Sequence, residues 1–511
     1  MRWPLWALTV AFTASVLPLV FKLLVYTSNA ERHGETTDAP DAKGARLVAV
    51  EIQLSPRSGW GLFALNVLAH LKSHGKFWPV VTTRPSHRCD SLESQPGESK
   101  SFIAKAYRRM RRDQGGLWAQ LDHRSHRTGT TFDVKGMLAD VAGIKHAAST
   151  PPLILHGVPQ EFEDTPEQHH LWGRDNNNIG AAFFERDRLS PAAVRNAHAY
   201  DLVLVGSMWN LHTLRQHGVQ HSKLILQGVD TQLFTPVNVN NSQRGHASTA
   251  MLPLPWPAAE RLVGDRHNRF VVFSGGKLEL RKGQDLVIAA FRKFLKLHED
   301  DDRDIVLATA WFNQWPATAT NIDASDARHV RGSPRFSTNH SGGYEHMHVE
   351  EWLEQNGVPA RRGVHMQEVS QHEIAALLQH ADVAVFPNRA EGGTNLAAME
   401  AMASGVPVII SNNTGHIDIV NEAHCFPLSN QQPLHQPGLE GWSESFVDEI
   451  VYQLEMVYTD REDAQQRGQA AAAFIRDRFS WEHAIQHLSN VLHDFAEQQD
   501  AHTRNYAALT E

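Results

Sequence analysis

Short apolar runs alternate with helical patterns along most of the chain. The clearest unit has an apolar run at residues 383–387, a glycine-containing loop, a helical pattern at 395–403 and a second apolar run at 406–410. Other strand-like runs occupy residues 47–54, 153–155, 202–205, 224–226, 270–273 and 304–312. Because strands alternate with helices, the pattern predicts an α/β fold with parallel sheets.

The length of 511 residues exceeds that of one ordinary domain. Residues 236–268 are rich in Asn, Ser, Pro and Gly and predict a linker between two α/β halves, residues 46–235 and 269–475. Residues 316–345 show no periodicity and are expected to form an inserted loop. Helical patterns at residues 443–458, 462–479 and 481–498 close the chain. The last segment, residues 476–511, is assigned to a C-terminal helix.

The amino-terminal segment is strongly apolar. Residues 4–21 carry no charge, and a membrane-spanning helix needs roughly 20 such residues. We therefore expect a transmembrane signal anchor at residues 1–26, followed by a polar stem at residues 27–45. A cleaved signal peptide, with Ser28 and Ala30 before the cut, is the alternative. The anchor predicts a single-pass membrane protein, in the Golgi or endoplasmic reticulum lumen of a eukaryote or the cytoplasmic membrane of a bacterium.

Composition and charge exclude several kinds of partner. The formal net charge of -9 predicts no strong attraction to nucleic acid. A basic run at residues 105–112 is either a solvated helix face or a contact with anionic lipid. Two distant cysteines form neither a disulfide framework nor a cysteine zinc site. The alternation of His346, His348 and Glu350 also fits one face of a strand, and without further ligands we predict no metal.

Two glycine-containing loops of the second half have the composition of anion sites. The first contains Lys277 and Lys282, and such a basic, glycine-rich loop suits a diphosphate, although a basic turn is the plain alternative. The second contains Gly392 and precedes a helix, so its N–H groups and the helix dipole favour a phosphate. The flanking Glu391 and Glu400 would repel a phosphate, so we assign them another task, such as holding sugar hydroxyls.

Four fragments occur in a specific order along the chain. They are Gly59-x-Gly61; Gly228-Val229-Asp230 followed by Phe234; Lys277 with Lys282-Gly283; and Glu391-Gly392 through Glu400-Ala401-Met402-Ala403-x-Gly405-x-Pro407. Together they resemble a retaining GT-B glycosyltransferase of the family-four type. The resemblance spans residues 46–498. It implies two facing Rossmann-like domains, a nucleotide-sugar donor bound mainly to the second, and a final helix crossing back to the first.

The resemblance also implies roles for individual residues. Lys277, which stands where the family usually has Arg, and Lys282 would neutralise the donor diphosphate. Glu391 and His156 would approach the transferred sugar, and these four are the catalytic candidates. The expected donor contacts are Gly59, Gly61, Gly275, Gly276, Gly392, Gly393, Thr394, Asn395, Leu396 and Glu400, the last through the ribose hydroxyls. The Gly59-x-Gly61 loop could equally host an acceptor. Glu185 is a candidate acceptor contact.

One departure from the family pattern leaves a question open. The family spacing is commonly Glu-x7-Glu, whereas eight residues separate Glu391 from Glu400, so Glu391 reaches the sugar only if the loop bulges. The implied reaction transfers a hexose to a glycan, lipid or protein with retention of configuration, without metal or other cofactor. The alternatives are a sugar phosphorylase or sugar-phosphate synthase of the same fold, and a non-catalytic nucleotide-sugar-binding protein.

Overall fold

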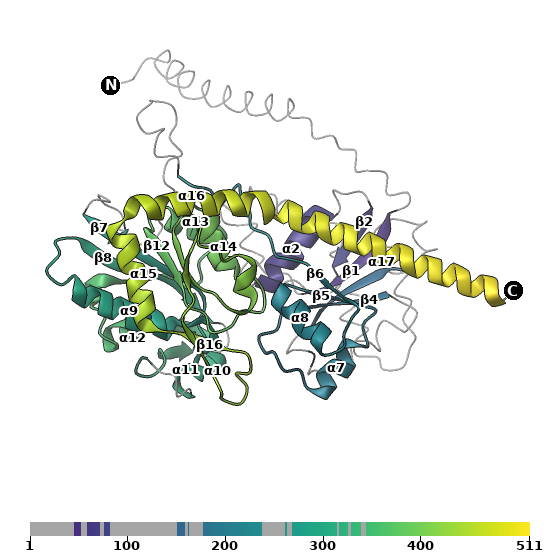
Figure 1. Cartoon of the computed structure of the whole chain (residues 1–511), viewed down its shortest axis with the longest axis horizontal. Helices are drawn as coiled ribbons and strands as arrows, with labels where there is room; N and C mark the ends of the chain where they lie inside the picture. Colours follow the sequence, from purple (N-terminus) through teal and green to yellow (C-terminus); the bar gives the residue numbers. More distant parts are fainter. Residues whose placement is uncertain are drawn as a thin grey trace, which may run out of the picture. The chain divides into compact units, whose positions relative to one another are not determined.

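The computed structural model describes most of the chain after residue 44 (Figure 1). The described residues are 45–52, 59–71, 76–81, 151–158, 162, 177–237, 261–262, 268–313, 316–324, 329–338 and 344–510. The expected anchor at residues 1–26, the stem up to residue 44 and the basic run at 105–112 lie outside them. Within these ranges no helix has the length and apolar character needed to cross a membrane.

The first sheet contains six parallel strands in the order β2-β1-β3-β4-β5-β6. They are β1 (Arg46–Glu51), β2 (Phe77–Val81), β3 (Leu153–Val158), β4 (Asn177–Ala182), β5 (Leu202–Val205) and β6 (Ser222–Leu224). Helices α2 (Gly59–Leu71), α7 (Pro191–Ala197) and α8 (Met208–Gln216) pack on it. Because helices cover both faces, the central residues of β1, β3 and β5 form continuous buried runs instead of alternating.

The second sheet is also parallel, with the order β11-β8-β7-β12-β13-β14. Its strands are β7 (Arg269–Lys277), β8 (Asp304–Phe312), β11 (Gly363–His365), β12 (Val383–Phe386), β13 (Val408–Ser411) and β14 (Phe426–Leu428). In order of appearance this is 3-2-1-4-5-6, the doubly wound arrangement. Such sheets bind ligands beyond the carboxyl ends of the strands where the order reverses, which here is between β7 and β12.

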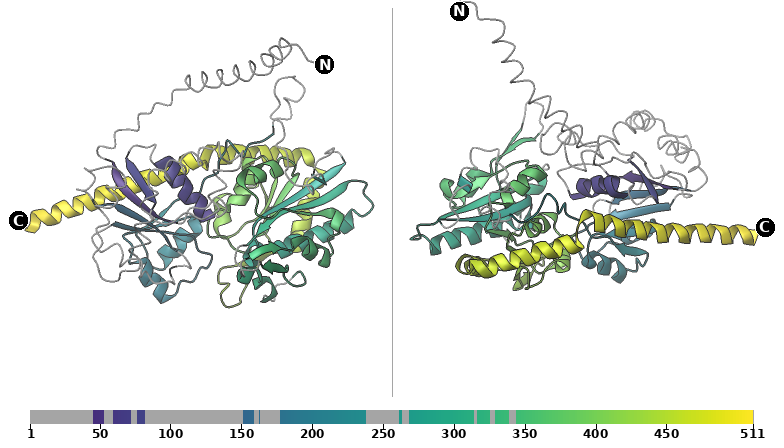
Figure 2. Two further views of the ribbon diagram at one scale, coloured as in Figure 1. Left: turned by 180° about the vertical axis from the view of Figure 1, so that it is seen from behind. Right: turned by 90° about the horizontal axis from the view of Figure 1, so that it is seen from above.

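Helices cover both faces of the second sheet (Figures 1 and 2). One face packs against α9 (Gln284–Leu297), α12 (Val349–Gln355) and α15 (Val447–Thr459). The other packs against α13 (Gln371–Leu378), α14 (Leu396–Ala403) and α16 (Arg461–Arg478). The two parallel-sheet halves predicted from the sequence are therefore confirmed.

The last helix, α17 (Trp481–Thr510), runs along the first sheet beside α2 (Figures 1 and 2). Ile485 and Leu488 are fully buried in the same hydrophobic core as strand β1 and helix α2. Arg46 at the start of β1 forms an ion pair with Asp500, with Nη1 3.2 Å from Oδ2. Residues 476–478, which the sequence assigned to this helix, instead end α16.

The structure corrects three glycine-containing segments. Gly59 and Gly61 form the first turn of α2, although a loop was expected. Strand β3 continues through His156 to Val158, so His156 lies within a strand and not at its end. Strand β7 stays paired with β8 as far as Lys277, so Gly275 and Gly276 are strand residues. In each case packing or pairing of the flanking apolar residues extends the element into the glycines.

Two further segments differ from the sequence pattern. The expected loop at residues 316–345 contains α10 (Pro316–Ala319), α11 (Asn321–Ala324) and β9 (Phe336–Thr338), which pairs with β10 (Tyr344–Met347). Residues 443–445, expected to begin a helix, form β16 (Ser443–Ser445) in a hairpin with β15 (Gln431–Pro433). The short 3-10 turns are η8 (Leu280–Lys282), η9 (Ala360–Arg362) and η10 (Thr414–Asp418).

Candidate functional site

The loops that follow β7 and β12 meet at the reversal of strand order. The first consists of η8 and Gly283, which leads directly into α9. Gly283 has a φ of 71°, and a Cβ at this position would lie 2.3 Å from the Pro387 carbonyl oxygen. Only glycine fits that close approach. The contact brings η8 against the loop that carries Glu391.

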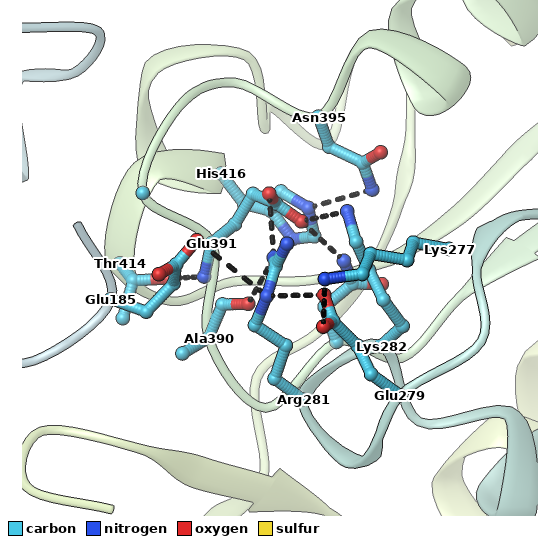
Figure 3. Close-up of polar contacts among 12 residues, drawn as sticks. Glu185, Lys277, Glu279, Arg281, Lys282, Ala390, Glu391, Asn395, Thr414 and His416 are labelled. Atoms are coloured by element: carbon cyan, nitrogen blue, oxygen red, sulfur yellow. Dashed lines mark hydrogen bonds and ion pairs between the residues drawn. The ribbon is translucent and has the colours of Figure 1, made fainter. Parts of the chain in front are cut away.

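The Glu391 carboxylate lies between two cations (Figure 3). Its Oε1 accepts from Arg281 Nη1 at 2.8 Å, and its Oε2 accepts from Lys282 Nζ at 2.5 Å. Asn388 Nδ2 also donates to Oε2 at 2.7 Å, and the Glu391 backbone N–H donates to Thr414 Oγ1 at 2.8 Å. Despite the longer spacing to Glu400, Glu391 therefore points at the expected cationic loop.

Two more carboxylates face the Nε atom of Arg281 (Figure 3). Arg281 Nε is 2.7 Å from Glu279 Oε1 and 3.5 Å from Glu185 Oε1. Lys277 Nζ is 2.9 Å from Glu279 Oε2. The cation–carboxylate cluster thus has three cations, Lys277, Arg281 and Lys282, and three carboxylates, Glu185, Glu279 and Glu391. The expected acceptor contact, Glu185, comes to this cluster from the segment after β4.

Burial and charge together set the protonation states of the cluster. Burial alone would raise the pKa of Glu391, but Arg281 and Lys282 lower it to about 2. Burial likewise opposes ionisation of Glu279, and Arg281 and Lys277 bring its pKa below the ordinary value. Burial lowers the pKa of Lys282, with Glu391 opposing that shift. Both carboxylates are therefore ionised at neutral pH.

Asn395 and His416 adjoin this cluster. Asn395 has a φ of 61°, an uncommon value for a residue other than glycine. His416 Nδ1 donates to the Ser411 carbonyl at 3.0 Å, so its Nε2 accepts from Asn395 Nδ2 at 3.1 Å. Burial lowers the pKa of His416 to about 4, which leaves the ring neutral. Because Asn395 makes no side-chain cap, the first-turn N–H groups of α14 favour an external acceptor such as a phosphate.

The expected donor contacts at residues 392–394 have packing partners. A Cβ at Gly392 would lie 2.7 Å from the Phe184 carbonyl oxygen, so the loop approaches the backbone after β4 too closely for any side chain. The Gly392 carbonyl accepts from Ser207 Oγ at 2.8 Å. A Cβ at Gly393 would lie 3.2 Å from Phe183. Thr394 is fully buried, and its hydroxyl contacts the sulfur of Met399.

The remaining glycine candidates and Leu396 are placed by the elements that hold them. Gly275 and Gly276 precede Lys277 in β7, beside the cluster. Gly59 and Gly61 lie in the first turn of α2. Leu396 is partly buried and packs against core residues of both sheets.

Glu400 lies in α14 with 4% of its surface exposed. Burial raises its pKa to about 8, and a side-chain hydrogen bond with Gln371 opposes that rise. Glu400 therefore holds a proton at neutral pH. A protonated carboxyl both donates and accepts a hydrogen bond, which suits contact with a hydroxyl.

We expect this buried carboxyl to make stability depend on pH. The folded pKa is raised, so the folded state binds more protons than the unfolded state from about pH 4.5 to pH 8, and stability falls as pH rises through this window. Glu400→Gln removes the effect. By calorimetry its unfolding free energy should match wild type near pH 5 and exceed it by a few kcal/mol, on the order of the full shift, near pH 9. If the unfolding free energies of the two proteins change in parallel with pH, the raised pKa of Glu400 is wrong.

His156 is 2% exposed and belongs to a separate polar group in the first sheet. Its Nδ1 contacts the Glu51 carboxylate, and its Nε2 lies 2.9 Å from Asn178 Oδ1. The Tyr200 ring packs against its edge. The structure therefore joins His156 to the neighbouring strands β1 and β4. Its contact with a transferred sugar stays a prediction.

The sequence patterns did not identify several residues that build the site. Arg281 and Glu279 lie in the predicted basic loop, and the pair Arg281-Lys282 was the available signal. His416 and Arg389 had no distinguishing pattern.

The histidines at 346 and 348, weighed above as metal ligands, contact each other, and His348 bonds to Ser337. In the part of the chain that the structure describes, no three His, Cys, Asp or Glu side chains are arranged to hold a metal ion.

Comparisons with known proteins identify the type of fold. Residues 246–488 match the model of family 4 glycosyltransferases in conflict systems. A glycosyltransferase from Rickettsia africae ESF-5 superposes with a TM-score of 0.55 at 11% identity, covering 88% of this chain and 98% of the other. The sucrose-phosphate synthase of Thermosynechococcus elongatus gives 0.51 at 14% identity, with the same coverage. No curated protein matches in sequence.

Proposed function

We propose that this chain transfers a hexose from a nucleotide sugar to an acceptor hydroxyl with retention of configuration. The family match over residues 246–488 and the shared fold support its resemblance to GT-B glycosyltransferases of the family-four type. The single observation that carries the proposal is the pair of cations, Arg281 and Lys282, held on Glu391 at the switch between β7 and β12. Fixed cations there suit a leaving diphosphate.

The proposed chemistry assigns a task to each part of the cluster. Lys282, Arg281 and Lys277 stabilise the negative charge that develops on the diphosphate as the glycosidic bond breaks. The N–H groups at the start of α14 donate hydrogen bonds to the same charge. Glu391, ionised and fixed between Arg281 and Lys282, accepts hydrogen bonds from sugar hydroxyls.

Retention follows in this proposal from attack on the same face. The acceptor hydroxyl approaches the face that the diphosphate leaves, and the leaving diphosphate takes the hydroxyl proton as the new bond forms. The charge of the three cations supplies the electrostatic stabilisation, and we propose that neither a metal nor another cofactor is required. Protonated Glu400 holds ribose hydroxyls of the donor.

The test is a donor screen followed by product analysis. The purified chain is titrated with nucleotide sugars that differ in base and hexose, and then incubated with the tightest-binding donor and an acceptor panel in excess EDTA. We expect selective binding of one donor and a glycoside with the donor's anomeric configuration by NMR. Binding without transfer or hydrolysis would favour a non-catalytic role, and a requirement for inorganic phosphate would favour a phosphorylase.

We also propose that residues 1–26 anchor the protein as a single membrane pass. The basis is the uncharged run at residues 4–21, whose length suits a bilayer. The full chain should stay with membranes after alkaline carbonate washing, whereas a chain beginning at residue 46 should be released. Release of both chains would contradict the anchor.

Glu279 should compete with the donor diphosphate for cations. It is ionised and lies 2.9 Å from Lys277 Nζ and 2.7 Å from Arg281 Nε. We expect Glu279→Gln to tighten binding of UDP or GDP, whichever the wild type prefers, by about threefold to tenfold in low-salt calorimetry.

The matched control for that substitution is Glu351→Gln. Glu351 also pairs with an arginine, Arg335, but lies on the exposed surface. It should leave nucleotide affinity unchanged. Unchanged or weaker nucleotide affinity in Glu279→Gln would show that Glu279 does not compete with the diphosphate for Lys277 and Arg281.

A further inference from the structure

A cavity of about 360 Å³ opens beside the cation–carboxylate cluster. The hairpin between β15 and β16 forms one wall, and the loop of Glu279 and Arg281 forms another. The polar and aromatic side chains that line it are Glu185, Glu279, Arg281, Asn321, Gln436 and Trp442. Nothing in the proposed donor chemistry uses Trp442, Gln436 or Asn321.

Trp442 is held in place by the segment after β4. Its indole Nε1 donates to the Glu185 carbonyl oxygen at 2.9 Å. The Glu440 carbonyl, in the same hairpin, accepts from the Asp187 backbone N–H at 3.2 Å. Trp442 is half-buried and packs against the core of the second sheet. The indole is therefore a fixed apolar surface at the cavity wall.

The lining selects against an anionic ligand. The two carboxylates of Glu185 and Glu279 both lie against the single guanidinium of Arg281, so an anion entering here meets two like charges. The remaining polar groups, Asn321 and Gln436, are amides that donate and accept hydrogen bonds. An aromatic surface beside convergent hydrogen-bonding groups suits a neutral ligand with an apolar face and several hydroxyls.

We propose that this cavity is the acceptor subsite and that it binds a neutral saccharide against Trp442. The inference rests on the proposed glycosyltransferase function. Arg281 connects the subsite to the reaction, because its Nη1 contacts Glu391 while its Nε faces Glu279 and Glu185. A saccharide that bonds to these two carboxylates has a hydroxyl next to the proposed diphosphate cradle.

The test measures saccharide and nucleotide binding separately on the full chain. Saturation-transfer NMR with glucose, galactose, mannose, N-acetylglucosamine and their common disaccharides, in the presence of UDP, identifies the tightest saccharide. We expect Trp442→Ala and Glu185→Gln each to lower the affinity for that saccharide by about tenfold or more. Affinity for UDP should change by less than about twofold in Trp442→Ala. Glu185→Gln removes a carboxylate from Arg281, as Glu279→Gln does, and should bind UDP as tightly as the wild type or more tightly.

Controls separate a lost subsite from a misfolded protein. Tyr452→Ala removes an aromatic side chain that is 60% exposed on α15, and it should leave both affinities unchanged. Trp442→Phe keeps an apolar ring with less area and should weaken saccharide binding less than Trp442→Ala. Unchanged melting temperatures, together with UDP affinity that is not weakened, show that each variant is folded.

The outcomes distinguish this inference from the function on which it rests. If the chain binds UDP or another nucleotide but no saccharide, or if Trp442→Ala leaves saccharide affinity unchanged, the acceptor subsite is wrong and the glycosyltransferase proposal stands. If Trp442→Ala weakens nucleotide sugars but not free saccharides, the cavity holds the donor sugar. If neither nucleotides nor nucleotide sugars bind, the proposed function itself fails.

Discussion

Replacing Lys282 with methionine is expected to lower sugar transfer by about 100-fold to 1000-fold, because it removes a fixed charge from the proposed leaving-group site. The methionine keeps most of the side-chain volume but cannot donate to Glu391, which Lys282 Nζ contacts at 2.5 Å. The loss should appear in kcat more than in KM, since the charge on the diphosphate grows as the bond breaks. Single-turnover kinetics with the donor selected by screening measure it.

A matched substitution on the same half of the chain is Lys293→Met. Lys293 also pairs with a carboxylate, Asp448, but its side chain is 51% exposed. We expect its transfer rate to equal that of wild type. Lys282→Arg keeps the charge with altered geometry and should retain more activity than Lys282→Met. Equal rates for Lys282→Met and wild type would remove Lys282 from the proposed mechanism.

The sequence predicted the parts of the structure that depend on local patterns. The bounds of β5 and β8 agree with their apolar runs, because each is an uninterrupted segment with clear ends. The two loops that meet at the strand-order reversal were also predicted. Their residues follow apolar strands, and parallel strands place their carboxyl ends at one edge of a sheet.

The side-chain partners depended on contacts between distant segments. Arg281 and Glu391 are separated by 110 positions, and no local pattern shows which cation a carboxylate will face. The helical pattern from residue 443 concealed a hairpin, because three residues that pair with Gln431–Pro433 look helical in isolation. His156 was assigned to the sugar by position alone, whereas Glu51 and Asn178 hold it within the first sheet.

The partners of Arg389, a fully buried arginine next to the site, also come from distant segments and could not be predicted from the sequence. Its guanidinium makes a bidentate pair with Asp285, at 2.8 and 2.7 Å, and its Nε donates to Glu444 at 2.8 Å. Its Nη1 also donates to the Leu280 carbonyl at 2.7 Å, and its backbone N–H donates to the Arg281 carbonyl at 2.7 Å. Arg389 therefore fixes the turn that presents the cations to Glu391.

Replacing Arg389 with methionine should lower the unfolding free energy by about 3–5 kcal/mol, because Asp285 would then be buried without its cation and Glu444 would keep only its contact with His329. Denaturant unfolding measures the loss. Transfer activity of the remaining folded protein should also fall, since the Leu280 carbonyl loses its partner and the turn is less well fixed.

An exposed ion pair provides the contrast for this buried one. Arg335 pairs with Glu351 at 3.1 Å, and their side chains are 67% and 52% exposed, so Arg335→Met should cost no more than about 1 kcal/mol. Arg389→Met leaves buried carboxylates without this arginine. If that causes the loss of unfolding free energy, adding Asp285→Asn should recover part of it, because it removes one buried charge. A double variant less stable than Arg389→Met would show instead that packing, not charge, is what Arg389 supplies.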